Sequence, residues 1–272
     1  MSTSDTQPAV NSRFIVTKEY RRFVEFCDAC RRYRYIGVCT GAPGVGKTLS
    51  ARHYTGWDAL EPWLSPLRIG DPVPMDVLTG ALLYTPSVVT TPRRLDEHLR
   101  GLRRGYHRLV ETALHPDQEM DWLAEPTHVE ILIVDEADRL KTLGLEVLRE
   151  VHDRTEIGLV LIGMPGFEKR LARYPQLYSR VGFVHHYRAL SSEELRFILA
   201  HHWSRLGLTF APDDFTDAEA LAAISRITSG NFRLVQRLFS QIERVLEINQ
   251  VQMISQEVVE AARESLVIGS TG

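Results

Sequence analysis

The chain has 272 residues, of which 44% are hydrophobic and 25% are charged, so it is long enough to bury a sizeable core. A formal net charge of −3 and a pI near 6.4 exclude a generally basic protein that coats nucleic acid. No apolar run approaches the roughly 18 residues of a membrane span, and segment 1–11 is polar without a signal-peptide core. We therefore expect a soluble, cytoplasmic protein.

The first two thirds of the chain alternate between apolar runs and amphipathic segments. The expected elements are a helix over 17–32, a strand over 35–40, a helix from 49 to 54, a strand over 82–89, a helix over 92–114, a strand over 129–134, a helix over 140–151 and a strand over 157–162. Such alternation predicts an α/β domain with a parallel, doubly wound sheet. Ligands bind such sheets at the carboxyl ends of the strands.

After Arg188 the pattern predicts helices only. Ser191-x-x-Glu194 and Thr216-x-x-Glu219 have the spacing of capping boxes, and Asn231 and Ser255 can cap two further helices. We therefore expect a flexible arm over 1–12, a nucleotide-binding α/β domain over 13–188, a four-helix lid over 189–268 and a disordered tail over 269–272.

A glycine-rich segment follows the first predicted strand. It has the spacing Gly-x4-Gly-Lys-Thr, and its expected ligand-binding residues are Gly41, Ala42, Pro43, Gly44, Val45, Gly46, Lys47, Thr48 and Leu49. Backbone N–H groups of such a loop surround phosphate at a helix N-terminus. Lys47 is expected to reach the β- and γ-phosphates of ATP, and the Thr48 hydroxyl to bind Mg²⁺. The alternative is a glycine-rich turn without a ligand.

The predicted strand 129–134 ends in two carboxylates, Asp135 and Glu136. A strand ending in this way is typical of a Walker B element, in which Asp135 would hold Mg²⁺ and Glu136 would act as general base toward water. Two solvated acids at a helix start are the alternative. Asp-Glu-Ala-Asp over 135–138 also matches a helicase class, but those enzymes need two sheet domains and the chain has room for one.

The three cysteines are too few for a disulfide framework. Cys27-Asp-Ala-Cys30 has the spacing of half a metal site, but it lies in a helical pattern with no second pair, so core packing is expected. The histidine pairs 185–186 and 201–202 also lack partners at ligand spacing and are expected to be structural.

These motifs, with Gly230-Asn-Phe-Arg233 opening the third lid helix, resemble those of the AAA+ ATPases. The strings over 134–141, 161–166 and 174–181 are similar to those of bacterial transposition regulators of the TnsC, TniB and MuB group. The resemblance covers about residues 14–266. It implies a cytoplasmic bacterial protein that forms a homo-oligomer with ATP between subunits.

The resemblance also implies roles for single residues. Arg180 matches the arginine finger, which reaches the γ-phosphate held by a neighbouring subunit, with Arg173 as the rival position. Arg233 matches the sensor 2 arginine of the lid. Surface ion pairs are the alternative for both arginines. Met164 occupies the sensor 1 place, and because a thioether cannot orient water as an amide or hydroxyl does, we expect slow hydrolysis.

Helix 92–114 is the densest basic segment of the sequence. Its candidate DNA contacts are Arg93, Arg94, Arg100, Arg103, Arg104 and Arg108. No motif for reading bases is visible, so binding would be sequence-independent and sensitive to salt. A solvated helix face, offset by Asp96, Glu97 and Glu111, is the alternative.

The resemblance therefore implies an ATPase that assembles on double-stranded target DNA and recruits or activates a transposase, with a target-selection protein as a further partner. Two alternatives stay open on the sequence. One is a helicase loader or origin-binding ATPase, and the other is a signalling ATPase that works without DNA.

Overall fold

The computed structural model describes residues 14–65, 73–115 and 126–266. The expected arm over 1–12 and tail over 269–272 lie outside these residues. In the described part, no helix is both long and apolar enough to cross a membrane.

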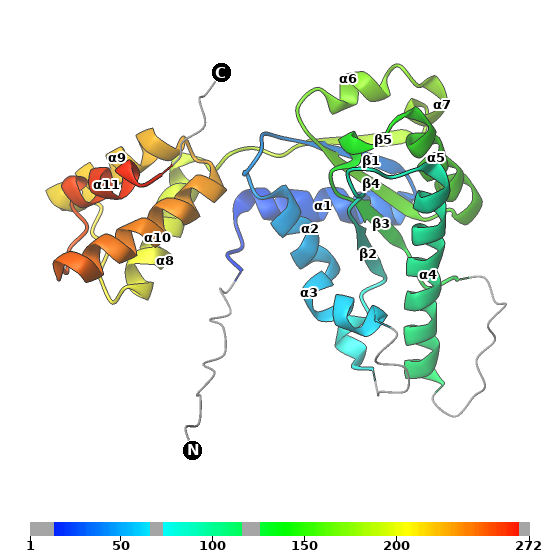
Figure 1. Cartoon of the computed structure of the whole chain (residues 1–272), viewed down its shortest axis with the longest axis horizontal. Helices are drawn as coiled ribbons and strands as arrows, with labels where there is room; N and C mark the ends of the chain where they lie inside the picture. The colour runs from blue at the N-terminus through cyan, green and yellow to red at the C-terminus, as the bar shows by residue number, and fades with distance from the viewer. Residues whose placement is uncertain (1–13, 66–72, 116–125, 267–272) are drawn as a thin grey trace.

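A five-stranded parallel sheet forms the centre of the larger part of the molecule (Figure 1). Its strands are β1 (Ile36–Thr40), β2 (Ala81–Tyr84), β3 (Ile131–Val134), β4 (Gly158–Gly163) and β5 (Val181–His186), in the order β2-β3-β4-β1-β5. Every residue of β1, β3 and β4 is buried. Burial on both faces explains why these strands are continuous apolar runs, and the predicted parallel α/β architecture is confirmed.

Helices cover both faces of the sheet, with α1 and α2 on one side and α4 and α5 on the other (Figure 1). The helices of this part are α1 (Lys18–Tyr33), α2 (Lys47–Thr55), α3 (Trp57–Leu60), α4 (Pro92–Leu114), α5 (Thr142–Thr155), α6 (Phe167–Leu171) and α7 (Pro175–Tyr178), with 3-10 turns η1 (Glu61–Leu64), η3 (Met75–Val77) and η4 (Ala137–Arg139). The Thr17 hydroxyl caps α1 by accepting from the Tyr20 N–H, and Thr91 caps α4 in the same way.

Two strands of the structure, β2 and β5, differ from what the sequence predicts. The strand expected over 82–89 ends at Tyr84, because Pro86 has no N–H for a ladder, and Val88 and Val89 are 80% and 76% exposed. Strand β5 was not predicted. It alternates half-buried and exposed residues at the edge of the sheet, so it lacks the continuous apolar run of its neighbours.

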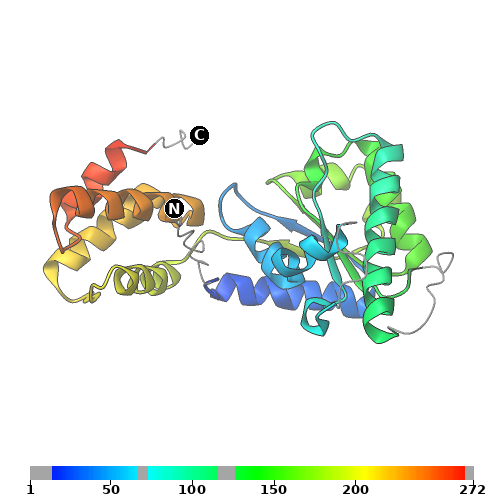
Figure 2. The same ribbon diagram turned by 60° about the horizontal axis from the view of Figure 1, so that its bottom comes forward.

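The helices α8 (Ser192–Arg205), α9 (Phe215–Thr228), α10 (Phe232–Asn249) and α11 (Gln256–Glu264) form a separate group beside the sheet (Figures 1 and 2). They enclose a hydrophobic cluster of their own, which includes Trp203 and Phe239. The capping box at Ser191 is confirmed, as are the caps at Asn231 and Ser255. The expected box at Thr216 is wrong, because the Asp214 carboxylate accepts from the first amides of α9.

All three cysteines are buried thiols of the core, Cys27 and Cys30 in α1 and Cys39 in β1. Burial raises the pKa of Cys30 to about 12 and that of Cys27 well above its ordinary value. Buried thiols with raised pKa values are poor nucleophiles and poor metal ligands, which agrees with the predicted packing role.

Candidate nucleotide-binding site

The glycine-rich loop joins β1 to α2 at the carboxyl edge of the sheet. Gly44 has a φ of +81°, and a Cβ atom there would lie 2.6 Å from the Asn231 Oδ1 and 3.0 Å from the Arg233 Cβ. Glycine is required at this position for two reasons, because the backbone is left-handed and because the start of α10 packs directly against it.

Helix α2 begins without a side-chain cap. Gly46 occupies the N-cap position, and no side chain bonds to the first turn. The first amides of a helix have no intrahelical partner, so they are available to an anion and the helix dipole favours one. The Lys47 Nζ donates to the Gly41 and Ala42 carbonyls at 2.6 and 2.9 Å, and burial lowers the pKa of this ammonium group. A lysine beside the uncapped start of a helix fits a polyphosphate.

The expected magnesium ligands lie in contact. The Thr48 hydroxyl donates to the Asp135 Oδ2 at 2.6 Å, and Asp135 is 3% exposed. Hydroxyl and carboxylate oxygens are the hard donors that Mg²⁺ accepts. The two side chains come from α2 and from the end of β3, so the sheet brings together residues 87 positions apart. The donor set therefore fits a magnesium ion.

Glu136 follows Asp135 with a φ of +51°, which is an unusual conformation for a residue other than glycine. Its N–H donates to the Asp135 Oδ1 at 2.9 Å, and its half-exposed carboxylate forms an ion pair with Arg139. Arg139 also donates to the Pro86 carbonyl at 3.2 Å, in the connection between β2 and α4. One arginine thus links the expected general base to the connection that leads into α4.

A pocket of about 680 Å³ opens above these groups. Its walls include Lys47, Thr48, Asp135, Glu136 and Arg233. Arg233 is held there because its N–H donates to the Gly44 carbonyl at 2.9 Å, and the Asn231 Nδ2 donates to the Pro43 carbonyl at 2.8 Å. The sheet and the C-terminal helices therefore meet at the phosphate loop.

Two further residues line this pocket. Met164, the expected sensor 1 residue, follows β4 and is 39% exposed. Thr85 follows β2 and places a hydroxyl on the same wall. Sequence reasoning missed Thr85, although its place directly after a predicted strand of a parallel sheet was a usable signal.

A second pocket of about 700 Å³ adjoins the first and shares Gly46, Leu49, Phe232 and Gln236 with it. Apolar and aromatic side chains from distant segments line it, including Ile15, Val45 and Tyr187. Phe14 stacks on His53 at its edge, with ring centroids 3.8 Å apart. A pocket beside the phosphate loop that combines aromatic and apolar walls with polar groups at its edge suits a nucleobase. Apart from Val45, Gly46 and Leu49, sequence reasoning missed these residues.

The expected arginine finger lies outside both pockets. Arg180 precedes the edge strand β5, and its guanidinium binds both carboxylate oxygens of Asp153 at 2.5 and 2.8 Å. This ion pair lowers the pKa of Asp153. The rival Arg173 is exposed, and its side chain has no ion pair within the described ranges.

Helix α4 divides its arginines between two faces. At about 100° per residue, Arg93, Arg94, Arg100, Arg104 and Arg108 fall within an arc of about 120°. Arg103 lies about 180° from Arg94, is 5% exposed, and donates to the Pro126 carbonyl at 3.1 Å. The expectation that Arg103 contacts DNA is therefore corrected, because its side chain is enclosed by its own protein.

The exposed arginines differ in their pairing. Arg93 pairs with Glu97 and Arg100 with Asp96, whereas Arg94, Arg104 and Arg108 form no ion pair in the described part of the chain.

Comparison with known proteins agrees with this geometry. Residues 30–171, just over half of the chain, match the family described as AAA domain. A "Potential ATP-binding protein" of Staphylococcus aureus is 44% identical over 266 residues, which cover 95% of this chain and 98% of that relative. The "ATP-dependent target DNA activator B" of Escherichia phage Mu is 30% identical over 176 residues, which cover 62% of this chain and 49% of the phage protein.

Solved structures with the same fold include the Holliday junction branch migration motor RuvB of Thermotoga maritima. It has a TM-score of 0.60 at 19% identity and covers 94% of this chain and 71% of its own. The ORC2 protein of Aeropyrum pernix has a TM-score of 0.58 at 17% identity, covering 96% of this chain and 72% of its own. At such identities the likeness concerns the fold alone. With the phosphate loop, the paired Thr48 and Asp135 and the family match in agreement, the chain belongs to the AAA domain family of P-loop ATPases.

Proposed function

We propose that this protein is an ATP-dependent, sequence-independent DNA-binding ATPase that assembles on double-stranded target DNA and there recruits or activates a transposase. The observation that carries the DNA part is the exposed arginine face of α4, on which Arg94, Arg104 and Arg108 are left without an ion pair in the described chain. The match to a phage target DNA activator over 62% of this chain supports the transposition part.

In the proposed mechanism, ATP is the substrate and its phosphates lie against the amides at the start of α2. Lys47 would leave the Gly41 and Ala42 carbonyls and contact the β- and γ-phosphates, while Arg233 would approach from α10. Bound Mg²⁺ would neutralise charge on the phosphates, held by Thr48 and Asp135. Glu136 would accept a proton from the attacking water once its carboxylate is released from Arg139.

The proposed assembly places Arg180 of one subunit near the ATP of the next. Its position before an edge strand supports this role, because an edge of the sheet is open to a neighbour. Assembly would require exchange of the Asp153 carboxylate for phosphate, both of which accept two bonds from a guanidinium group. Such exchange makes ATP hydrolysis dependent on assembly. Met164, which cannot orient the attacking water, lowers the rate of hydrolysis further.

The test measures retention of labelled duplexes of unrelated sequence by fluorescence anisotropy, with a slowly hydrolysed ATP analogue, with ADP and without nucleotide. We expect retention and oligomers visible by electron microscopy only with the analogue, and a steep loss of affinity with rising salt. Lys47→Ala should lose nucleotide binding and retention together, while Lys169→Ala, an exposed lysine of α6, should behave as wild type.

Three outcomes would contradict the proposal in different ways. Nucleotide binding without any DNA retention would favour a signalling ATPase. Retention of one duplex sequence only would favour an origin-binding protein. Nucleotide binding by Lys47→Ala would overturn the phosphate-loop assignment. A transposase encoded beside this gene, and its stimulation by the assembled protein, would test the final step.

A further inference from the structure

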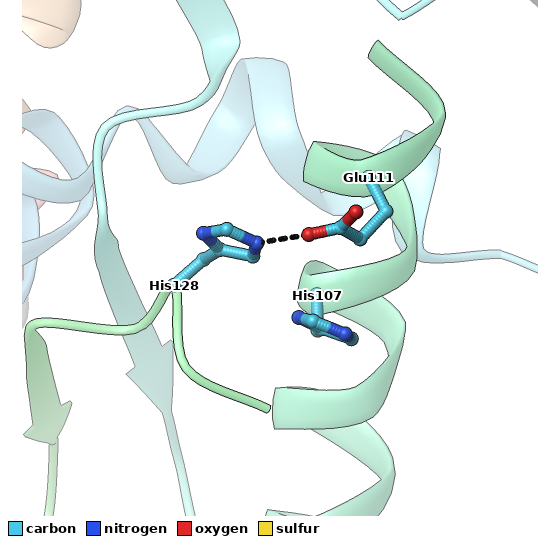
Figure 3. A group of neighbouring side chains, drawn as sticks. All are labelled: His107, Glu111 and His128. Carbon is cyan, nitrogen blue, oxygen red and sulfur yellow. Dashed lines mark hydrogen bonds and ion pairs between the residues drawn. The ribbon is translucent and has the colours of Figure 1, made fainter. Parts of the chain in front are cut away.

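Two histidines and a glutamate meet at the far end of α4, outside both pockets of the nucleotide site. His107 and Glu111 lie one turn apart on α4, and His128 lies in the segment that leads into β3 (Figure 3). Their ligand atoms all lie within 4.8 Å of one another. The His128 Nε2 and the Glu111 Oε1 are 2.5 Å apart, and the rings of His107 and His128 are stacked with centroids at 4.9 Å.

We propose that His107, Glu111 and His128 bind a zinc-type divalent cation that fastens the end of α4 to the entry of β3. Two imidazoles and a carboxylate, with water in the fourth position, are an established ligand set for Zn²⁺. Tetrahedral coordination would place the ligand atoms roughly 3.4 Å apart, so small side-chain rotations close the site. The two nitrogen ligands favour zinc and similar transition metals over Mg²⁺ and Ca²⁺.

The charges around the site are compatible with a cation. The Glu111 carboxylate lies against the His128 ring and supplies negative charge to the site. The stacked imidazoles of His107 and His128 can both bind one metal as neutral ligands. Arg103 lies one turn before His107 and is positively charged, whereas Glu111 lies one turn after it and is negatively charged. A cation is therefore attracted to the Glu111 side of His107.

The position of the site indicates a structural role. His128 and Asp135 are at opposite ends of β3, roughly 20 Å apart for an extended strand, so the cation is separate from the magnesium of ATP. Arg103 already holds the Pro126 carbonyl, two residues before His128. A metal would therefore strengthen an existing attachment between the basic helix and the Walker B strand.

The experiment uses the tag-free full-length protein, stripped with a chelator and kept in Mg²⁺ without nucleotide. Zn²⁺ is titrated in competition with a chromophoric chelator, and Co²⁺ absorption reports the coordination geometry. We expect one equivalent of Zn²⁺ with a tetrahedral Co²⁺ spectrum, and a Zn²⁺-dependent rise in the melting temperature. His128→Gln and Glu111→Gln should each weaken binding at least about tenfold.

His98→Gln is the matched control, because His98 is an exposed histidine of the same helix outside the cluster. It should bind like wild type. Absence of one-to-one binding, or unchanged affinity in both His128→Gln and Glu111→Gln, would overturn the site. Circular dichroism checks that each variant is folded. Glu111 lies on α4 and His128 lies outside it, so if one variant unfolds, the other still tests the cation site.

Discussion

The two carboxylates at the end of β3 have different surroundings although they are adjacent in sequence. Asp135 is buried against Thr48, whereas Glu136 is half-exposed and paired with Arg139. The ion pair occupies the Glu136 carboxylate, so it must be broken before that carboxylate can accept a hydrogen bond from an attacking water. We infer that Arg139 restrains the expected general base until the β2–α4 connection, which Arg139 also contacts, is rearranged.

This restraint predicts opposite effects for two substitutions. Glu136→Gln should bind ATP but lose turnover by about 10²- to 10⁴-fold, because the base is removed. Arg139→Ala should raise unstimulated turnover, because the carboxylate is released. Phosphate release is measured for both, with Arg149→Ala on α5 as the control for loss of an ion-paired arginine. Lower turnover in Arg139→Ala would show that the ion pair does not restrain hydrolysis.

His202 predicts a pH dependence of stability. It stacks on Phe239 in the helical cluster, and its Nδ1 is buried with no hydrogen-bond partner among the described residues. Burial, with the nearby charges of Arg205 and His201, lowers its pKa from 6.5 to about 4. The unfolded chain therefore binds a proton at a higher pH than the folded one, so stability is full above pH 6.5 and falls toward pH 4.

The titration of His202 should make the free energy of unfolding about 2 kcal/mol lower at pH 5 than at pH 7.5. Urea unfolding at pH 7.5 and pH 5 measures it, and His202→Leu should lack this part of the loss because leucine does not titrate. His201→Gln, which changes an exposed neighbour, should keep it. Equal pH dependence in wild type and His202→Leu would refute the assignment.

Helix α4 uses its two faces for different purposes. Leu95, Leu99 and Tyr106 pack into the core, and buried Arg103 lies at the edge of that apolar face. Arg93, Arg94, Arg100 and Arg104 are exposed and Arg108 is partly exposed. Under the proposed function, each contact that they make with a phosphate would add to the salt dependence of DNA binding. The Thr91 cap places Arg93 and Arg94 at the N-terminal end of the helix, whose dipole also favours phosphate.

Reversal of charge on the exposed face tests this division. Arg94→Glu combined with Arg104→Glu should weaken duplex retention by at least tenfold and reduce the slope of affinity against salt, because phosphate contacts are lost. Arg196→Glu combined with Arg244→Glu makes the same charge change on exposed arginines of α8 and α10 and should have a small effect. Equal losses in both pairs would show that net charge, and not this face, governs binding.

The molecule as a whole has two hydrophobic cores, one around the sheet and one among the helices α8 to α11. Polar contacts near the phosphate loop join these two parts. The Glu194 carboxylate accepts from the Glu19 N–H at 3.0 Å, and Asn231 and Arg233 contact the loop itself. A nucleotide at the loop would therefore touch both parts, and under the proposed function it would set their relative position and so the surface offered to the next subunit.

A mixing experiment tests whether the site is completed by that subunit. Arg180→Ala should bind ATP normally but not hydrolyse it, and Glu136→Gln should fail for a different reason. If the arginine acts across subunits, mixing the two variants should restore part of the turnover, since some interfaces then combine an intact Arg180 with an intact Glu136. Normal turnover in Arg180→Ala, with failure in Arg173→Ala, would assign the finger to Arg173.

Much of the candidate nucleotide site could be predicted, because its residues lie in short contiguous segments of the sequence. Gly41 to Thr48 are contiguous, and Asp135 and Glu136 end a strand whose complete burial makes it a continuous apolar run. The sheet that brings Thr48 to Asp135 followed from the alternation of strands and helices. The position of Arg103 around the helix, about 180° from Arg94, could also have excluded it from the predicted DNA contacts.

Other features depend on segments that are distant along the chain. Strand β5 is half-exposed, so no apolar run marks it, and the ion pair of Arg180 with Asp153 joins the residue before β5 to the last turn of α5. The apolar pocket draws on residues from Phe14 to Gln236, and His128 reaches His107 only because the chain returns to α4 before entering β3. The amino-acid pattern was sufficient for the phosphate loop, the Walker B strand and the α/β class, since periodicity and spacing are local. The second pocket, the partner of Arg180 and the histidine cluster required the folded chain, because packing sets distances between residues that are far apart in sequence.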